Sequence, residues 1–183
     1  MTASARGAVA VLLLVFVAAC GTTVVDDPEP FSQRPFDLDV AAVDPCAAFT
    51  TQQRLDLKLR EGRAGTSHGE TSRGCTWSSE DGLGFNLQTF DQTASAAIGA
   101  EPTSTIVTVA GFGAVQSSPP AQGTGLPFCQ VVLDVADDAS LRAQLQVSPL
   151  AADAAQRTVD GTCAQVHDVA ALMLENLRAQ QLG

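Results

Sequence analysis

The sequence predicts an α+β fold, an antiparallel sheet of about four to five strands with N-terminal helices and a long C-terminal helix packed on one face. Apolar and polar residues alternate strictly over Leu141–Val147, which is typical of a strand with one face on a core and the other in water. Toward the end of the chain, apolar residues recur at steps of four and three, which predicts a helix with one apolar stripe. The residues of this stripe are Val159, Cys163, Val166, Ala170, Met173 and Leu177.

The composition is that of one globular domain with short appendages. The chain has 183 residues, of which 45% are hydrophobic and 16% are charged, and single domains most often have about 100–150 residues. Ten Lys and Arg stand against twenty Asp and Glu, so the formal charge is −10. A chain this acidic lacks the basic surface that contacts phosphates, so we expect no nucleic acid partner.

The first 19 residues have the pattern of a secretory signal. Arg6 precedes a continuous apolar run over residues 8–19, which is too short for the roughly 20 residues of a membrane-spanning helix. The run ends in Val17-Ala18-Ala19-Cys20-Gly21, which resembles the bacterial lipobox. In that motif the cysteine thiol receives a diacylglyceryl group and becomes the new N-terminus. We therefore expect Cys20 to be lipidated and to hold the protein in the bilayer, on the extracytoplasmic face of the cell membrane; the alternative is an ordinary signal peptide in which Cys20 is incidental.

Residues 20–43 are expected to form the lipidated Cys20 and an extended tether. Three prolines and three acidic residues lie between residues 21 and 35, without apolar periodicity, and proline stiffens a linker. The alternative is that Phe31 and Phe36 dock on the surface of the domain.

A single domain is then expected over residues 44–183. Asp44 is suited to cap a helix and Pro45 fits its first turn, which predicts a helix start. Thr50 or Thr51 is suited to cap a second turn that runs through Leu55.

Period-two alternation predicts the strands, with turns at Glu80–Gly82 and at Asp137–Asp138. We expect a polar loop over 61–73, a short Ala-rich helix over 93–100, and a mobile loop that includes 119–125. The last helix is expected to start at Asp153. The predicted strands are 75–78, 85–90, 105–109 running on into 111–115, 128–135 and 141–147.

Four cysteines remain for the domain, namely Cys46, Cys75, Cys129 and Cys163. An even number in an exported domain predicts two disulfides, and four cysteines allow three pairings. We favour Cys46–Cys75 and Cys129–Cys163, because each bond joins a helix to a strand. A zinc site is disfavoured because the chain has no C-x-x-C pair, and we expect no metal and no cofactor.

These motifs together resemble one family. They are the lipobox, the Asp44-Pro45-Cys46 helix start, the Gly74-Cys75-Thr76-Trp77 strand, and later cysteines in a strand and in the last helix. The chain resembles, over about residues 20–180, the actinobacterial lipoprotein family known as domain of unknown function 3558. The resemblance implies an exported, lipid-anchored α+β domain and supplies no catalytic or ligand residues.

Two histidine motifs are candidates for catalysis. His68 lies in Ser67-His68-Gly69-Glu70, which suggests a hydrolase, but no Gly-x-Ser-x-Gly elbow occurs and neighbours in sequence are not partners in space. His167 and Asp168 lie beside the apolar stripe of the last helix, where a surface pair is the simpler interpretation than a base with its orienting acid.

Three further motifs have a structural and a functional interpretation. Asp134, Asp137 and Asp138 surround a turn, where a solvated turn is favoured over a calcium site because the spacing is not that of an EF-hand. Trp77 is expected to pack in the core against a disulfide rather than to stack on a ligand. Gly111-x-Gly113 is not a phosphate loop, because no lysine or helix cap follows.

The sequence therefore favours a non-catalytic lipoprotein of the cell envelope. It would bind a small apolar ligand or another envelope protein through its sheet or through the Pro119–Pro127 region. The alternatives are an envelope hydrolase that uses His68 and a purely structural or antigenic surface protein.

Lipidation makes a first prediction. Replacing Cys20→Ala should abolish globomycin-sensitive processing and move the protein from membranes to soluble fractions, because the acylated sulfur is then lost. Fractionation and immunoblotting measure this, and continued retention of the variant in membranes would contradict lipidation.

Overall fold

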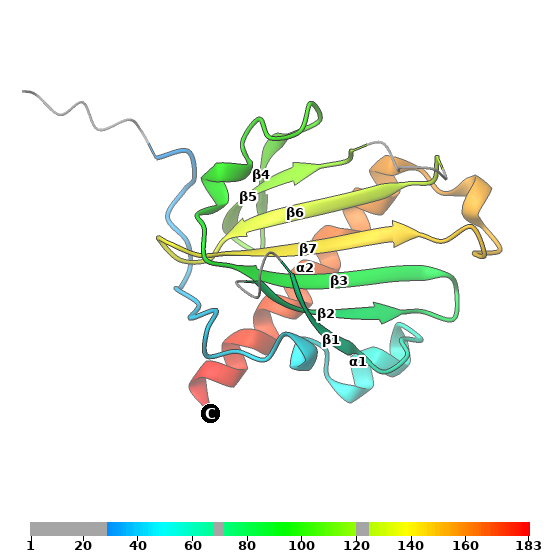
Figure 1. The fold of residues 1–183 in the computed structure, drawn as a ribbon, viewed down its shortest axis with the longest axis horizontal. Helices are drawn as coiled ribbons and strands as arrows, with labels where there is room; N and C mark the ends of the chain where they lie inside the picture. Colours follow the sequence, from blue (N-terminus) through cyan, green and yellow to red (C-terminus); the bar gives the residue numbers. More distant parts are fainter. Residues whose placement is uncertain (1–28, 68–71, 120–124) are drawn as a thin grey trace, which may run out of the picture.

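The computed structural model describes residues 29–67, 72–119 and 125–183. These residues form one seven-stranded antiparallel sheet, in the order β1-β2-β3-β7-β6-β5-β4, and a long C-terminal helix, α2, that crosses one face of it (Figure 1). The strands are β1 (Arg63–Ser67), β2 (Ser72–Ser78), β3 (Leu83–Phe90), β4 (Thr105–Val109), β5 (Phe112–Ser117), β6 (Phe128–Asp134) and β7 (Ser140–Val147). The helices are α1 (Thr51–Asp56) and α2 (Val159–Leu182), with short 3₁₀ helices η1 (Pro45–Ala47), η2 (Ala94–Ala97) and η3 (Ala154–Gln156).

The antiparallel sheet and the long C-terminal helix confirm the predicted class, but the predicted number of strands is wrong. Strand β1 lies within the segment expected to be a polar loop. It was not predicted because its residues are polar or small and show no alternation. The segment 105–115 is two strands, since Ala110 (φ 51°) and Gly111 (φ 85°) form a two-residue turn between Val109 and Phe112.

The helices also differ from the prediction at several ends. The helix expected over 93–100 is only the 3₁₀ turn η2, and the last helix begins at Val159 instead of near Asp153 because the Thr158 hydroxyl accepts a hydrogen bond from Gly161 N. Val159 is 44% exposed, whereas the other five stripe residues are buried. The second N-terminal turn is α1, which Thr50 caps in a reciprocal capping box with Gln53.

One face of the sheet forms the core. Helix α2 contacts β6 and β7, while η1 contacts β2 and β3. The inward side chains of β6 and β7 are almost fully buried; they are Cys129, Val131, Leu133, Leu141, Ala143, Leu145 and Val147. Trp77 belongs to this core: it is 1% exposed, and its ring lies 5.0 Å from that of Phe49 in an edge-to-face pair.

The prediction that all helices pack on one face of the sheet is wrong for η2, which lies on the opposite face. The connection from β3 to β4, residues 91–104, passes to the far edge of the sheet and carries η2, which contacts β5 and β6. Ala96 and Ala97 lie with Val132 and Arg142, whose side chains point away from the core face. The connection therefore covers part of the opposite face.

Both disulfides are present with the favoured pairing. Cys46–Cys75 joins η1 to β2, and Cys129–Cys163 joins β6 to α2. Each bond therefore links the sheet to an element that covers its core face.

The segment expected to be a free tether is folded against the domain from residue 29 onward. We call residues 29–43 the strap. Leu38, Val40 and Val43 are 0%, 7% and 1% exposed, and Leu38 N donates to Val135 O at 2.9 Å. The folded unit thus begins well before Asp44. The apolar side chains of Leu38, Val40 and Val43, which were expected to belong to a linker, are part of the core.

The part of the chain that the structure describes has no helix with both the length and the apolar character that crossing a bilayer requires.

The packing of the strap makes a second prediction. Replacing Leu38→Ala should lower the free energy of unfolding by about 2–5 kcal/mol, because it leaves a cavity in the core. The matched control is Leu55→Ala on α1, a leucine that is 67% exposed, for which we expect a change within about 0.5 kcal/mol. Denaturant unfolding measures both; equal effects would show that the strap does not contribute to the core.

Candidate functional site

The face of the sheet opposite α2 carries a row of neutral polar side chains. Cross-strand pairing places Thr76 opposite Asn86, Asn86 opposite Gln144, Gln144 opposite Gln130, and Gln130 opposite Ser117. We call these five residues the polar row. They come from five adjacent strands, β2, β3, β7, β6 and β5, so the row extends about 19 Å across the sheet at the usual strand spacing.

Hydrogen bonds link most of the polar row. Gln144 Nε2 donates to Gln130 Oε1 at 2.8 Å, and Gln130 Nε2 donates to Ser117 Oγ at 2.9 Å. Asn86 Nδ2 donates to Thr76 Oγ1 at 2.8 Å, and Asn86 Oδ1 is buried without a donor among the described residues. A side-chain amide has two donor hydrogens and an oxygen that accepts two bonds, so each amide keeps unused capacity.

Arg142 and the β3–β4 connection flank the row on one side. Arg142 Nε donates to Gln88 Oε1 at 3.0 Å, and its guanidinium lies 4.7 Å from the centre of the Phe90 ring. Burial lowers the pKa of Arg142 from its ordinary value, although an arginine remains charged at neutral pH. A hollow of about 140 Å³ lies here between Arg142, Val132 and the alanines of η2.

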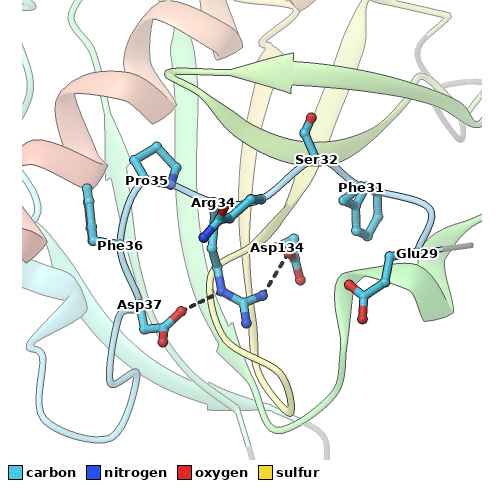
Figure 2. Close-up of a pocket in the computed structure, with 9 residues that line it drawn as sticks. Glu29, Phe31, Ser32, Arg34, Pro35, Phe36, Asp37 and Asp134 are labelled. Carbon is cyan, nitrogen blue, oxygen red and sulfur yellow. Dashed lines mark hydrogen bonds and ion pairs between the residues drawn. The ribbon is translucent and has the colours of Figure 1, made fainter.

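The strap forms a second hollow of about 610 Å³ at the end of the sheet, lined by residues 29 and 31–37 together with Asp134. Figure 2 shows the Arg34 guanidinium between Asp37 and Asp134, with Phe31 and Glu29 on the other side of the hollow. Arg34 Nη1 lies 2.8 Å from Asp134 Oδ2, and Arg34 also pairs with Asp37 and Asp137. The hydrogen bond to Asp37, with help from the other two carboxylates, raises the pKa of Arg34 above its ordinary value, so the cation is permanent.

The strap passes from one face of the sheet to the other. Phe31 packs over Gly113, where a Cβ would collide with its ring, on the face that carries the polar row. Phe36 lies on the core face, with its ring 4.8 Å from that of Phe112 and 4.4 Å from the Arg178 guanidinium. The structure therefore agrees with the alternative in which both phenylalanines dock on the domain.

The prediction of a solvated turn is wrong for two of the three aspartates of the β6–β7 turn. Asp134 and Asp137 pair with Arg34, so the chain itself supplies the positive charge, while Asp138 is exposed. Among the described residues, no three of His, Cys, Asp and Glu gather in a way that would hold a metal ion.

The two glycines of Gly111-x-Gly113 have structural roles. Gly111 takes the left-handed conformation of the β4–β5 turn, and Gly113 makes room for Phe31. Trp77 packs beside the Cys46–Cys75 bond, with Gly62 so close that a Cβ there would lie 2.7 Å from Cys75 Sγ.

Some of the sequence-predicted site residues lie in the described part of the chain and others do not. Cys20, His68 and residues 120–124 of the Pro119–Pro127 region lie outside the described residues, so predictions that depend on them stay predictions. His167 and Asp168 are neighbours on α2, but no hydrogen bond joins their side chains, and His167 Nε2 is buried without a partner among the described residues. This arrangement is not that of a base held by an orienting acid.

Sequence reasoning missed both the polar row and the Arg34 cluster. The alternation of Leu141–Val147 shows that Gln144 faces away from the core, but nothing local shows which residues lie opposite it. Arg34 meets Asp134 across 100 positions of the chain, a contact that no spacing rule detects.

Comparisons with known proteins give a family without a known activity. A family model described as "Protein of unknown function (DUF3558)" matches residues 15–176. No curated protein matches the chain. A crystal structure from Bacteroides thetaiotaomicron matches with 12% sequence identity and a TM-score of 0.32. The match covers 56% of this chain and 48% of that one, so this chain spans about half the length of the protein it matches, and the likeness carries no argument.

The environment of His167 makes a third prediction. Burial lowers its pKa below the ordinary value of 6.5, and the charge of Asp168 opposes this shift. The unfolded chain therefore binds the proton more tightly than the folded chain, so stability that is present above pH 6.5 is lost as the pH falls below it. We expect His167→Gln to reduce the loss of unfolding free energy between pH 7.5 and pH 5.5, and Asp168→Asn to enlarge it. Denaturant unfolding at the two pH values tests this, and an unchanged loss in both variants would contradict it.

Proposed function

This chain belongs to the DUF3558 family of proteins of unknown function, and from that premise we propose that it is a lipid-anchored protein of the cell envelope that binds a partner without catalysis. Its binding surface is the polar row on the sheet face opposite α2. The row is the single observation that carries the proposal.

Three features support the proposed location in the cell envelope. The apolar run before Val17-Ala18-Ala19-Cys20-Gly21 has the pattern of a lipoprotein signal. Two disulfides are typical of proteins that fold in an oxidising compartment. The family model begins at residue 15, so the match includes Cys20 together with the domain. Two or three acyl chains on Cys20 would make release from the bilayer very slow.

The chemistry of the polar row favours a hydroxyl-rich, uncharged ligand, and we propose a glycan chain of the cell envelope. Amides and hydroxyls both donate and accept hydrogen bonds, as sugar hydroxyls do. None of the five side chains is charged, so the row offers neither an acidic nor a basic polymer a specific charge partner. Adjacent strands lie about 4.8 Å apart, which is close to the length of one sugar unit in an extended chain.

The packing of the other face disfavours an apolar ligand beneath the sheet. The space between α2 and the sheet is filled by a continuous cluster of buried side chains, including Trp77, Phe85 and Phe112. An acyl chain would have to displace close-packed side chains there, at the cost that overpacking a core carries.

The binding proposal makes a fourth prediction. The detergent-solubilised lipoprotein should sediment with purified sacculi of its host's cell wall, and Gln130→Ala with Gln144→Ala should weaken this binding about tenfold, since each lost hydrogen bond contributes about 0.5–1.5 kcal/mol. Isothermal calorimetry with soluble fragments of the same glycan gives the affinity.

The control for these substitutions is Gln181→Ala, which removes an exposed amide at the end of α2 and should leave binding unchanged. Binding that is equal in the double variant and the wild type would contradict the assignment of the surface. If the wild-type protein does not sediment with sacculi, the proposal that its ligand is a cell-envelope glycan is contradicted.

A further inference from the structure

Strand β4 is an edge of the sheet, and within residues 29–67, 72–119 and 125–183 no further strand pairs with its outer side. It is the last strand in the order, and the sequence Thr-Ile-Val-Thr-Val contains no charge, no proline and no glycine. Ile106 is 53% exposed, and Thr105 and Thr108 are exposed as well. Edge strands with these properties pair readily with other strands.

The β4–β5 turn fixes which backbone groups of β4 are free. In a two-residue hairpin the closing pair, here Val109 and Phe112, is hydrogen-bonded, and bonded positions then alternate along the strand. Val107 therefore bonds to β5, while the N–H and C=O groups of Ile106 and Thr108 point away from it. Among the described residues, no hydrogen bond outside the sheet uses these four groups.

The other edge of the sheet contrasts with β4. Strand β1 begins with Arg63 and has Gly65 at its centre. A positive charge and a glycine are features that discourage edge pairing and weaken a strand. Of the two edge strands in the described part of the chain, β4 is the one in which every side chain is β-branched and uncharged.

We propose that β4 pairs with β4 of a second copy of this chain, antiparallel about a two-fold axis at Val107. The outward groups determine this register, because Ile106 must lie opposite Thr108 of the second copy for both to bond. Four backbone hydrogen bonds then form across the axis, and a continuous sheet of fourteen strands results.

The side chains fit the same register. Val107 lies opposite its own copy, Ile106 opposite Thr108, and Thr105 opposite Val109 of the second copy. Every such pair is between β-branched, uncharged residues, which favours cross-strand pairing, so the strand complements itself although the chain as a whole is acidic.

The axis of such a pair is perpendicular to the sheet, which has two consequences. Both polar rows lie on the same side of the joined sheet, where one extended glycan could contact both. Both copies of Glu29 lie at the same height along the axis, so two anchored chains can reach one bilayer. Confinement of anchored copies to a plane raises their effective concentration.

Cysteine crosslinking in intact membranes makes a fifth prediction. In full-length protein, Val107→Cys should give a disulfide-linked dimer on a non-reducing gel, because opposite residues of a non-hydrogen-bonded pair have Cα atoms about 4.5 Å apart, within the range that a disulfide spans. Ile106→Cys should give at least about tenfold less dimer, because its copy lies two positions out of register, beyond the limit of about 7 Å.

A pair of lysine substitutions in the Val107→Cys background separates edge pairing from chance contact. Ile106→Lys should reduce the dimer about tenfold, since edge lysines block strand pairing, whereas Ile98→Lys, at an isoleucine that is 41% exposed outside β4, should leave it unchanged. Peptide mapping of the two native disulfides identifies the folded protein on which the yields are scored.

The outcomes decide the proposal. Equal yields from Val107→Cys and Ile106→Cys would mean random collision, and no dimer from folded Val107→Cys would mean an unpaired edge; either result overturns it. Should Val107→Cys fail to form the native disulfides, the double variant Ile106→Cys with Thr108→Cys, whose side chains point away from the core, tests the same register. Glycan binding is measured separately, so failure of one proposal does not imply failure of the other.

Discussion

Burial of one face of the seven-stranded sheet beneath α2, η1 and the strap is the constraint on which the other features of this fold depend. The strands alternate, so each apolar side chain directed into the core leaves its neighbours directed to the opposite face. The β3–β4 connection covers part of that face, where Val115 is only 1% exposed. The polar row lies on the same face, where Ser117 is 4% exposed and the other four residues are half-buried or exposed. Its position is a consequence of the same alternation that builds the core.

Each disulfide joins the sheet to a helix that covers it, and neither joins two strands of the sheet. Cys46–Cys75 holds η1 on β2, and Cys129–Cys163 holds α2 on β6. Their loops span 29 and 34 positions, for which the chain-entropy model gives about 3.6 kcal/mol each. The sheet is thereby tied to its cover at two separated points, and the opposite face is left free of covalent links among the described residues.

Regular periodicity made some elements predictable from the sequence. Strand β7 and helix α2 have long, uninterrupted patterns. The favoured cysteine pairing, in which each bond joins a helix to a strand, is the one that the structure shows. Strand β1 gave no signal because its residues are small or polar, and the β4–β5 turn was missed because Ala110 rarely takes a positive φ.

Contacts between distant segments were not predictable in the same way. The burial of Leu38 depends on which elements surround it, and the polar row depends on β7 lying between β3 and β6, which the order of strands along the chain does not reveal. The family resemblance was right, but it supplied no residues for either feature.

The path of the strap also determines how the domain responds to mechanical load. Tension on the chain before Glu29 enters the fold through Phe31, over Gly113, and through the ion pairs of Arg34 with the β6–β7 turn. The backbone bond between Leu38 and Val135 comes next along the chain, and all of these contacts precede Cys46, the first residue held by a covalent crosslink. A pull from the amino-terminal side is therefore borne by non-covalent contacts that yield and re-form, and unravelling of the strap lengthens the protein before the disulfide-linked body is deformed.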